Sequence, residues 1–184
     1  MKCVFLDRDG TLIRHAPYLS DPAAVTLLPT VTAGLNELLR AGCKLFLHTN
    51  QSGIGRGYFS LAAAVACNEA MLGQIGLGPD LFQDIRICPE TPDQMTGCRK
   101  PSPAYAREII AKYGIATRDI CYLGDNVSDL MTGRNVGCLA VGVNTGVGDL
   151  RASAREHELQ EFPIYDTFLG AANHVLDHFG RARV

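Results

Sequence analysis

The chain has 184 residues, of which 47% are hydrophobic and 20% are charged, as in an ordinary globular protein, so we expect a single domain over residues 1–184. Its formal net charge of −2 gives no case for binding nucleic acid or an anionic membrane surface. No apolar stretch approaches the length of a membrane span, and the first expected strand leaves no room for a signal peptide, so we expect a cytoplasmic location.

Short apolar runs alternate with helical patterns along the chain, which predicts right-handed β–α–β units and an α/β fold with a mostly parallel sheet. The expected strands are Cys3–Leu6, Lys44–His48, Asp84–Cys88, Ile120–Leu123 and Leu139–Val143, and a weaker sixth at Phe162–Tyr165. Pro163 favours a sheet edge for the sixth strand. The expected helices are Val31–Ala41, Leu61–Ile75, Pro103–Tyr113, Ser128–Asn135 and Thr167–Phe179.

Two segments without a regular pattern interrupt this alternation, Arg14–Leu28 and Pro89–Arg99. Long loops in compact domains often carry function, although either segment could be a plain surface loop. Ser60 and Ser102 directly precede expected helices, so we expect both to be N-caps.

The chain contains seven cysteines, an odd number, and most of them lie in apolar segments. This usage favours reduced, buried thiols over a disulfide framework. The cysteines are Cys3, Cys43, Cys67, Cys88, Cys98, Cys121 and Cys138.

Polar clusters follow four of the expected strands. Because the carboxyl ends of parallel strands meet at one edge of a sheet, we expect the four clusters to converge there. The clusters are Asp7-Arg8-Asp9-Gly10-Thr11, Thr49-Asn50-Gln51-Ser52-Gly53, Arg99-Lys100-Pro101 and Gly124-Asp125-Asn126 with Asp129.

These residue types contain every part needed to hydrolyse a phosphate monoester. Asp7 and Asp125 offer the hard oxygen ligands that Mg²⁺ prefers, and Thr49 and Lys100 can hold an anion. Asp7 can attack phosphorus and form an aspartyl-phosphate. Asp9 can protonate the leaving oxygen and then take a proton from the attacking water.

The four clusters, in this order, resemble motifs I to IV of the haloacid dehalogenase (HAD) superfamily. The resemblance implies a Rossmann-like three-layer fold and catalytic roles for Asp7, Asp9, Thr49 and Lys100. It also implies a magnesium site made by Asp7, Asp9 through its backbone carbonyl, and Asp125, with Asp129 in support.

The intervals between Asp7, Thr49 and Lys100 are too short for a large cap domain, so the chain resembles a capless member with an open site. The segments from Thr49 to Tyr58 and from Cys98 to Pro101 resemble the D-glycero-D-manno-heptose-1,7-bisphosphate 7-phosphatases and histidinol-phosphate phosphatases. We therefore expect a small sugar bisphosphate, cleaved at C7, as the substrate, with histidinol phosphate as the rival. The implied substrate contacts are Asn50, Gln51, Ser52, Arg56 and Arg99.

The chain departs from this subgroup in the zinc loop that its members often carry. Only Cys88 and Cys98 remain of the four ligands, and Glu90 and Thr96 stand where a histidine and a cysteine would be. Two thiolates, a carboxylate and a hydroxyl make a poor tetrahedral zinc site, so we expect no structural zinc. The stretch Ile13-Arg14-His15 is also atypical of the subgroup.

Several residues in or beside these clusters allow interpretations other than a catalytic one. A calcium-binding EF-hand starting at Asp7 fails, because Leu12 and Tyr18 stand where it needs glycine and glutamate. His48 lies in an apolar strand and is expected to be a core residue. A protein that only binds sugar phosphates would not need Asp9, and a phosphotransferase would need a lid to exclude water. An open site could admit a nucleic-acid 3′-phosphate, although the net charge of the chain does not favour this substrate. We expect the protein to be a monomer or a weak homodimer.

Overall fold

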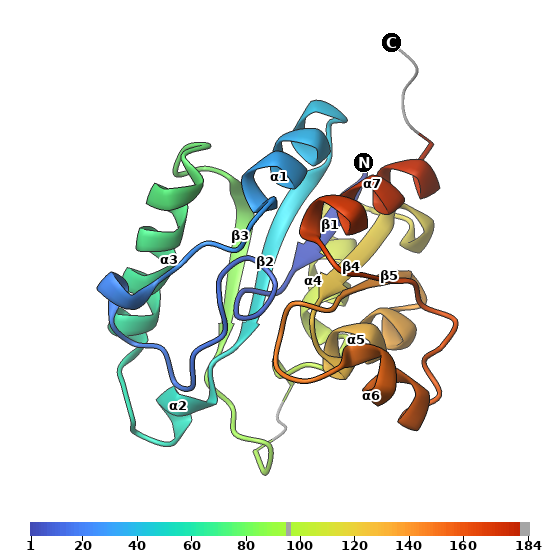
Figure 1. Cartoon of the computed structure of the whole chain (residues 1–184). Helices are drawn as coiled ribbons and strands as arrows, with labels where there is room; N and C mark the ends of the chain where they lie inside the picture. Colours follow the sequence, from blue (N-terminus) through green and yellow to red (C-terminus); the bar gives the residue numbers. More distant parts are fainter. Residues whose placement is uncertain (95–96, 181–184) are drawn as a thin grey trace.

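The structure is a computed structural model that describes residues 1–94 and 97–180. Figure 1 shows a central sheet with helices packed on both of its faces. Within the described residues the sheet has six strands in the order β3-β2-β1-β4-β5-β6, and all neighbours are parallel. The expected Rossmann-like α/β class is confirmed. The strands are β1 (Cys3–Leu6), β2 (Lys44–Asn50), β3 (Phe82–Cys88), β4 (Ile120–Gly124), β5 (Leu139–Val143) and β6 (Ile164–Tyr165).

The central strand β1 is fully buried because its side chains enter two different cores. Val4 and Leu6 belong to one hydrophobic cluster, and Cys3 and Phe5 belong to another. Successive side chains of a strand point to opposite faces, so each core covers one face of the sheet. The first core includes α1 (Val31–Arg40), α3 (Leu61–Ile75) and α7 (Phe168–His178), and the second includes α4 (Ala104–Tyr113), α5 (Val127–Val136) and α6 (Leu150–Glu156).

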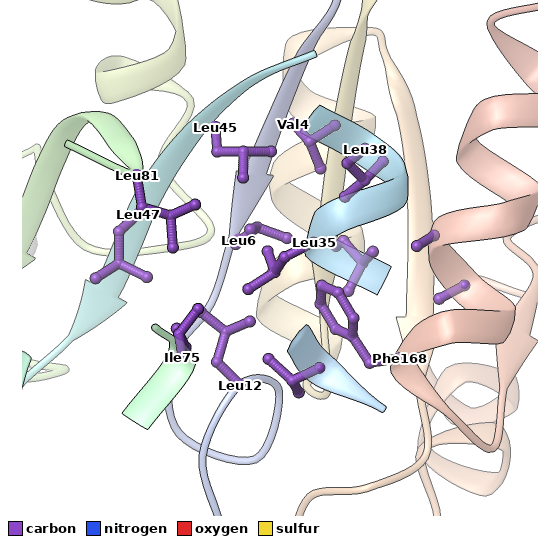
Figure 2. Close-up of a cluster of buried hydrophobic side chains, with 14 of the residues drawn as sticks. Val4, Leu6, Leu12, Leu35, Leu38, Leu45, Leu47, Ile75, Leu81 and Phe168 are labelled. Atoms are coloured by element: carbon purple, nitrogen blue, oxygen red, sulfur yellow. The ribbon is translucent and has the colours of Figure 1, made fainter. Parts of the chain in front are cut away.

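The first core stabilises the strands whose carboxyl ends carry the polar clusters. Figure 2 shows Leu35 and Leu38 of α1 packed against Val4 and Leu6, with Phe168 of α7 beside them. Each such side chain contributes about 1.5–3 kcal/mol when it leaves water. A Cβ on Gly34 would lie 2.6 Å from the Phe168 ring, so α1 and α7 can approach closely only with glycine there.

The expected strands and helices are all present, with small shifts at their ends. Two further helices were not expected: α2 (Ser52–Gly55) is a single turn, and α6 buries only Leu150 and Ala154. Two buried positions are too few to produce a helical periodicity in the sequence. Short 3₁₀ turns occur at Pro22–Ala24 and Thr117–Asp119.

One of the two expected N-caps is confirmed and the other is wrong. Ser60 Oγ accepts from the Ala63 amide at 3.2 Å and begins α3. Pro103 occupies the N-cap position of α4, so Ser102 lies one residue too early, although its Oγ still accepts from the Ala104 amide at 3.3 Å. The expected edge strand is confirmed as β6, restricted to two residues that follow Pro163. Among the described helices, none is long and apolar enough to span a membrane.

Candidate active site

The carboxyl ends of β1, β2 and β4 border a hollow of about 250 Å³. Its walls include Asp7, Asp9, Thr49, Lys100 and Asp125. These residues come from all four polar clusters, which the parallel strands and the loop before α4 bring to one edge of the sheet. The expected convergence of the four clusters is therefore present.

Lys100 lies at the bottom of this hollow between two carboxylates. Its Nζ is 2.6 Å from Asp7 Oδ1 and 2.5 Å from Asp129 Oδ1, and its side chain is only 3% exposed. Burial alone would lower the pKa of Lys100, but the two carboxylates together outweigh burial and raise it. Lys100 therefore stays charged, and it presents a fixed cation beside Asp7.

Asp125 lies in the same cluster of carboxylates. Burial raises the pKa of Asp125 well above its ordinary range, and repulsion from Asp7 and Asp129 adds to this effect. Burial also raises the pKa of Asp7. Ligand oxygens of the three aspartates lie within 4.8 Å of one another. A divalent cation would relieve this repulsion, and carboxylate oxygens are suitable ligands for magnesium.

Asp125 fits into this space only because two glycines leave room for its carboxylate. A Cβ on either Gly10 or Gly146 would overlap with that carboxylate. Thr11 Oγ1 donates to Asp125 Oδ1 at 2.9 Å, and Thr145 Oγ1 donates to the Gly10 carbonyl at 2.6 Å. Thr145 and Gly146 were not among the expected site residues, although they lie two and three residues after the end of β5, where such sheets place active-site loops.

Asp129 has a structural role besides its contact with Lys100. Its Oδ2 accepts from the Asn126 amide at 3.1 Å, and the Asn126 side chain caps the first turn of α5 in return. This reciprocal capping box fixes the start of α5 next to Asp125. Support of a metal by Asp129 stays a prediction.

Asp9 is held by two neighbours. Arg8 forms an ion pair with its carboxylate at 3.0 Å, and Gln51 Nε2 donates to Asp9 Oδ2 at 2.7 Å. The same Gln51 amide donates to Thr49 Oγ1 at 2.8 Å. Arg8 was not among the expected site residues, because a charged side chain next to a strand is usually exposed and Arg8 is fully buried.

Asn50 and Gln51 were expected to contact substrate, and the structure shows that each has protein partners. Asn50 Nδ2 donates to the Lys100 carbonyl at 3.2 Å, and Asn50 Oδ1 accepts from the Lys100 amide at 3.0 Å. This pair of bonds fixes the backbone of Lys100, while Asn50 also lines the hollow. Contact of either side chain with substrate stays a prediction.

A second hollow of about 330 Å³ lies beside the first and shares Asp9, His15 and Asn50 with it. Ser52 lines this second hollow, and Arg99 lines the first. Arg56 is exposed and does not line either of them. Of the expected outer contacts, the structure therefore brings Ser52 and Arg99 to the site and leaves Arg56 outside both hollows.

The expectation that all cysteines are reduced is wrong for one pair. Cys88 and Cys98 form a disulfide across the loop that precedes Lys100, whereas the other five are free thiols. Their approach follows from Glu90, whose carboxylate accepts from the backbone amides of Cys98 and Arg99 and folds the loop back. The two sulfurs cannot ligate zinc while they are bonded to each other, although ligand atoms of Cys88, Glu90 and Cys98 lie within 4.8 Å of one another. Thr96 lies outside the described residues, and the absence of structural zinc stays a prediction.

His48 is buried in the sheet, as expected of a core residue. Its Nδ1 lies 3.2 Å from the Tyr122 hydroxyl and its Nε2 lies 2.9 Å from the Cys98 carbonyl. Burial, followed by the nearby charge of Lys100, lowers the pKa of His48 from 6.5 to about 3. His48 is therefore neutral and joins β2 to the disulfide loop.

We expect His48 to make the fold less stable in acid. In the unfolded chain His48 binds a proton below its ordinary pKa of 6.5, whereas in the folded protein it stays neutral down to about pH 3. The free energy of unfolding is therefore highest above pH 6.5 and decreases as the pH falls from 6.5 towards about 3. The loss at about pH 5 is about 2 kcal/mol. Denaturation curves at about pH 7 and about pH 5 should show a smaller loss in His48→Gln than in the parent. The exposed His157→Gln serves as the control, and equal losses in all three proteins would contradict this role.

Comparisons with known proteins agree with this geometry. Residues 97–177 match the model of the HAD-hydrolase-like family. The chain is 34% identical over 153 residues to the D-glycero-beta-D-manno-heptose-1,7-bisphosphate 7-phosphatase of Pseudomonas aeruginosa, covering 79% of this chain and 82% of that relative. The Neisseria meningitidis serogroup B protein of the same name is 28% identical over 178 residues and is covered to 95%. The crystal structure of the Bordetella bronchiseptica D,D-heptose 1,7-bisphosphate phosphatase, complexed with magnesium and phosphate, superimposes with a TM-score of 0.85 at 29% identity, covering 96% of this chain and 99% of that one.

Proposed function

Since this chain belongs to the HAD-like hydrolases and is a phosphatase, we propose a substrate for it. The proposed reaction is removal of the C7 phosphate of D-glycero-D-manno-heptose 1,7-bisphosphate. One observation carries the proposal: Asp7, Asp125 and Lys100 line a single hollow together with Asp9. The substrate is taken from the relatives, since the Pseudomonas and Bordetella proteins carry this activity in their names.

The chemistry begins at Asp7. Its carboxylate attacks phosphorus, the bond to the sugar oxygen breaks, and Asp9 gives its proton to that oxygen as the sugar leaves. Asp9 then takes a proton from a water molecule, which attacks the aspartyl-phosphate and releases inorganic phosphate and free Asp7. Lys100 supports both steps, because its fixed positive charge lies 2.6 Å from the attacking carboxylate and offsets the charge of the phosphoryl oxygens.

Magnesium is the cation that suits this site. Asp7 and Asp125 would hold the cation through their carboxylates, and Asp9 would hold it through its backbone carbonyl. Asp129 would support the site without being a main ligand. The crowded carboxylates support this assignment, since burial and then repulsion between carboxylates raise the pKa values of Asp7 and Asp125, and a divalent cation would offset both effects. When bound, the cation supplies positive charge that polarises the phosphoryl group.

Gly146→Ala should weaken magnesium binding. The new Cβ would overlap with the Asp125 carboxylate and displace it, while the backbone of Gly146 needs no positive φ, so the effect is confined to this contact. The magnesium concentration for half-maximal activity should rise by about 10- to 100-fold. Gly73→Ala, which meets nothing within 4 Å, is the matched control. The contact has no importance for the metal if both variants titrate with magnesium like the parent.

The substrate is tested by comparing kcat/KM for heptose 1,7-bisphosphate, other sugar bisphosphates and histidinol phosphate in the presence of magnesium. We expect heptose 1,7-bisphosphate to exceed each of the others by about tenfold or more. A larger value for histidinol phosphate would replace the substrate and keep the chemistry. Binding of sugar phosphates without turnover of any ester would refute the enzymatic role itself.

The absence of a cap domain from the described residues favours hydrolysis over transfer of the phosphoryl group to a second sugar. A phosphotransferase must keep water from its aspartyl-phosphate, and the described residues contain no cap domain over Asp7. Product analysis with an added acceptor sugar separates the two reactions.

The cytoplasmic location also stays a prediction, which the five free thiols support and the Cys88–Cys98 disulfide opposes.

A further inference from the structure

Arg8 is a fully buried arginine between the two aspartates of the first motif, and the chemistry above gives it no part. A buried guanidinium is costly unless charge and hydrogen bonds compensate for it. Its neighbours supply both, because Asp9 provides a carboxylate on one side and α3 provides two oxygens on the other. Packing alone does not explain why a charged side chain, and not an apolar one, occupies this buried position.

Resting on the proposed function, we propose that Arg8 is a positioning residue that fixes the proton-donating carboxyl of Asp9, and that Asn68 of α3 fixes Arg8. Arg8 Nε donates to Asp9 Oδ2 at 3.0 Å, and Arg8 Nη2 donates to Asp9 Oδ1 at 3.2 Å while lying 3.0 Å from Oδ2. Two nitrogens of a planar guanidinium that contact both oxygens of a carboxylate restrict its orientation as well as its position.

The two oxygens of Asp9 are held differently. Oδ2 accepts from both Arg8 and Gln51, whereas the contacts of the described residues give Oδ1 only the longer bond from Arg8. A carboxylate oxygen has two positions for accepting hydrogen bonds, so Oδ2 is fully used and Oδ1 has one left. The proton that passes to the sugar oxygen therefore belongs on Oδ1.

The other side of Arg8 is attached to helix α3. Its Nη1 donates to Asn68 Oδ1 at 3.0 Å and more weakly to the Ala64 carbonyl at 3.5 Å. Asn68 is 3% exposed, so its amide oxygen is shielded from bulk water. The helix and the catalytic strand end are thus joined through one guanidinium, and loss of the Asn68 acceptor should free Arg8 to turn away from Asp9.

Positioning of an acid affects only reactions that need one. A sugar alkoxide is a poor leaving group and must be protonated as it departs, whereas p-nitrophenolate leaves without a proton. Asp9 is also the base of the second step, which both substrates share, so the comparison uses kcat/KM, which reports only the steps up to release of the leaving group. Misplacing Asp9 should therefore lower kcat/KM for a sugar phosphate far more than for p-nitrophenyl phosphate. Damage to the fold, to the nucleophile or to the metal site would slow both substrates alike.

The test measures kcat and KM of Asn68→Leu and Arg8→Lys with both substrates and magnesium. We expect kcat/KM for the sugar phosphate to fall by about 10- to 100-fold, and kcat/KM for p-nitrophenyl phosphate to change by less than about twofold. Asn68→Asp, which keeps an acceptor oxygen for Arg8, should restore most of the rate. Ser60→Ala, which removes the cap of α3 without touching Arg8, should not discriminate between the substrates.

Asp9→Asn separates failure of this inference from failure of the proposed function. If Asp9→Asn discriminates between the two substrates but the Asn68 and Arg8 variants do not, the acid is correctly assigned and Arg8 has no positioning role. If Asp9→Asn lowers kcat/KM equally for both substrates, the acid assignment fails first. An equal fall in kcat/KM for both substrates in Asn68→Leu would also overturn the positioning role.

Discussion

Asp7→Asn should abolish turnover and leave the protein folded. The asparagine amide has the size of the carboxylate but cannot attack phosphorus, so kcat for any phosphate ester should fall by on the order of 10⁴-fold or more. Unlike loss of the acid, this change should not depend on the leaving group. Burial raises the pKa of the Asp7 carboxyl, so a neutral amide is tolerated at this position, although Lys100 then keeps only Asp129 as a charged partner.

Two further proteins make this result interpretable. The exposed Asp80→Asn has the same change of charge and should keep the parent rate. Asp7→Glu keeps the carboxylate but moves it by one methylene, and it should also be inactive if position as well as charge is required. Acid quenching of the parent during turnover of labelled substrate should trap label on the protein, and Asp7→Asn should trap none. A variant that turns over at the parent rate would refute the nucleophile.

The fold was largely predictable because its strongest signals are local. The four fully buried residues of β1 produce a continuous apolar run, and α3 combines a good cap at Ser60 with fifteen residues up to its C-cap. By contrast, α6 has only two buried residues, and its start depends on Asp149 accepting from the Arg151 amide, which a polar loop sequence does not reveal. The N-cap of α4 lies at Pro103, one residue after the expected Ser102, which shows that a sequence places helix ends only to within a residue or two.

The candidate site was predictable as a set of reactive groups, but not as the frame that holds them. Asp7, Lys100 and Asp125 stand out because carboxylates and a lysine after buried strands are chemically conspicuous. Gly146 and Asn68 do not stand out, because their importance arises from contacts with residues far away in the chain. A single sequence contains no signal for such contacts, which depend on how the helices pack onto the sheet.

The disulfide illustrates the same limit. Counting cysteines predicted reduced thiols, and five of the seven are free. The remaining two meet because Glu90 folds the loop over β3 through backbone hydrogen bonds, a contact that composition does not encode. Where a loop brings two cysteines together, local geometry outweighs the average expectation for the chain.

Lys100→Met should cost both activity and stability. Lys100 neutralises Asp7 and Asp129, so removing its charge leaves two buried carboxylates without a cation, at a cost of about 3–5 kcal/mol near neutral pH. The same charge faces the phosphoryl group in the proposed mechanism, and its loss should lower kcat by on the order of 10³-fold. Chemical denaturation and steady-state kinetics at about pH 7 measure the two effects.

The pH dependence of Lys100→Met distinguishes this cause from general damage to the core. Burial raises the pKa of Asp7 in the folded protein, and without Lys100 only the backbone hydrogen bond from Arg8 opposes that increase. Folded Lys100→Met therefore binds protons more readily than its unfolded chain, so its stability relative to the parent should recover as the pH falls through the raised pKa towards the ordinary value of 3.8. The exposed Lys112→Met should match the parent at every pH. If the deficit of Lys100→Met stays constant between about pH 7 and about pH 5, the unpaired carboxylates are not its cause, and the ion pairs at the bottom of the hollow do not have the role assigned to them.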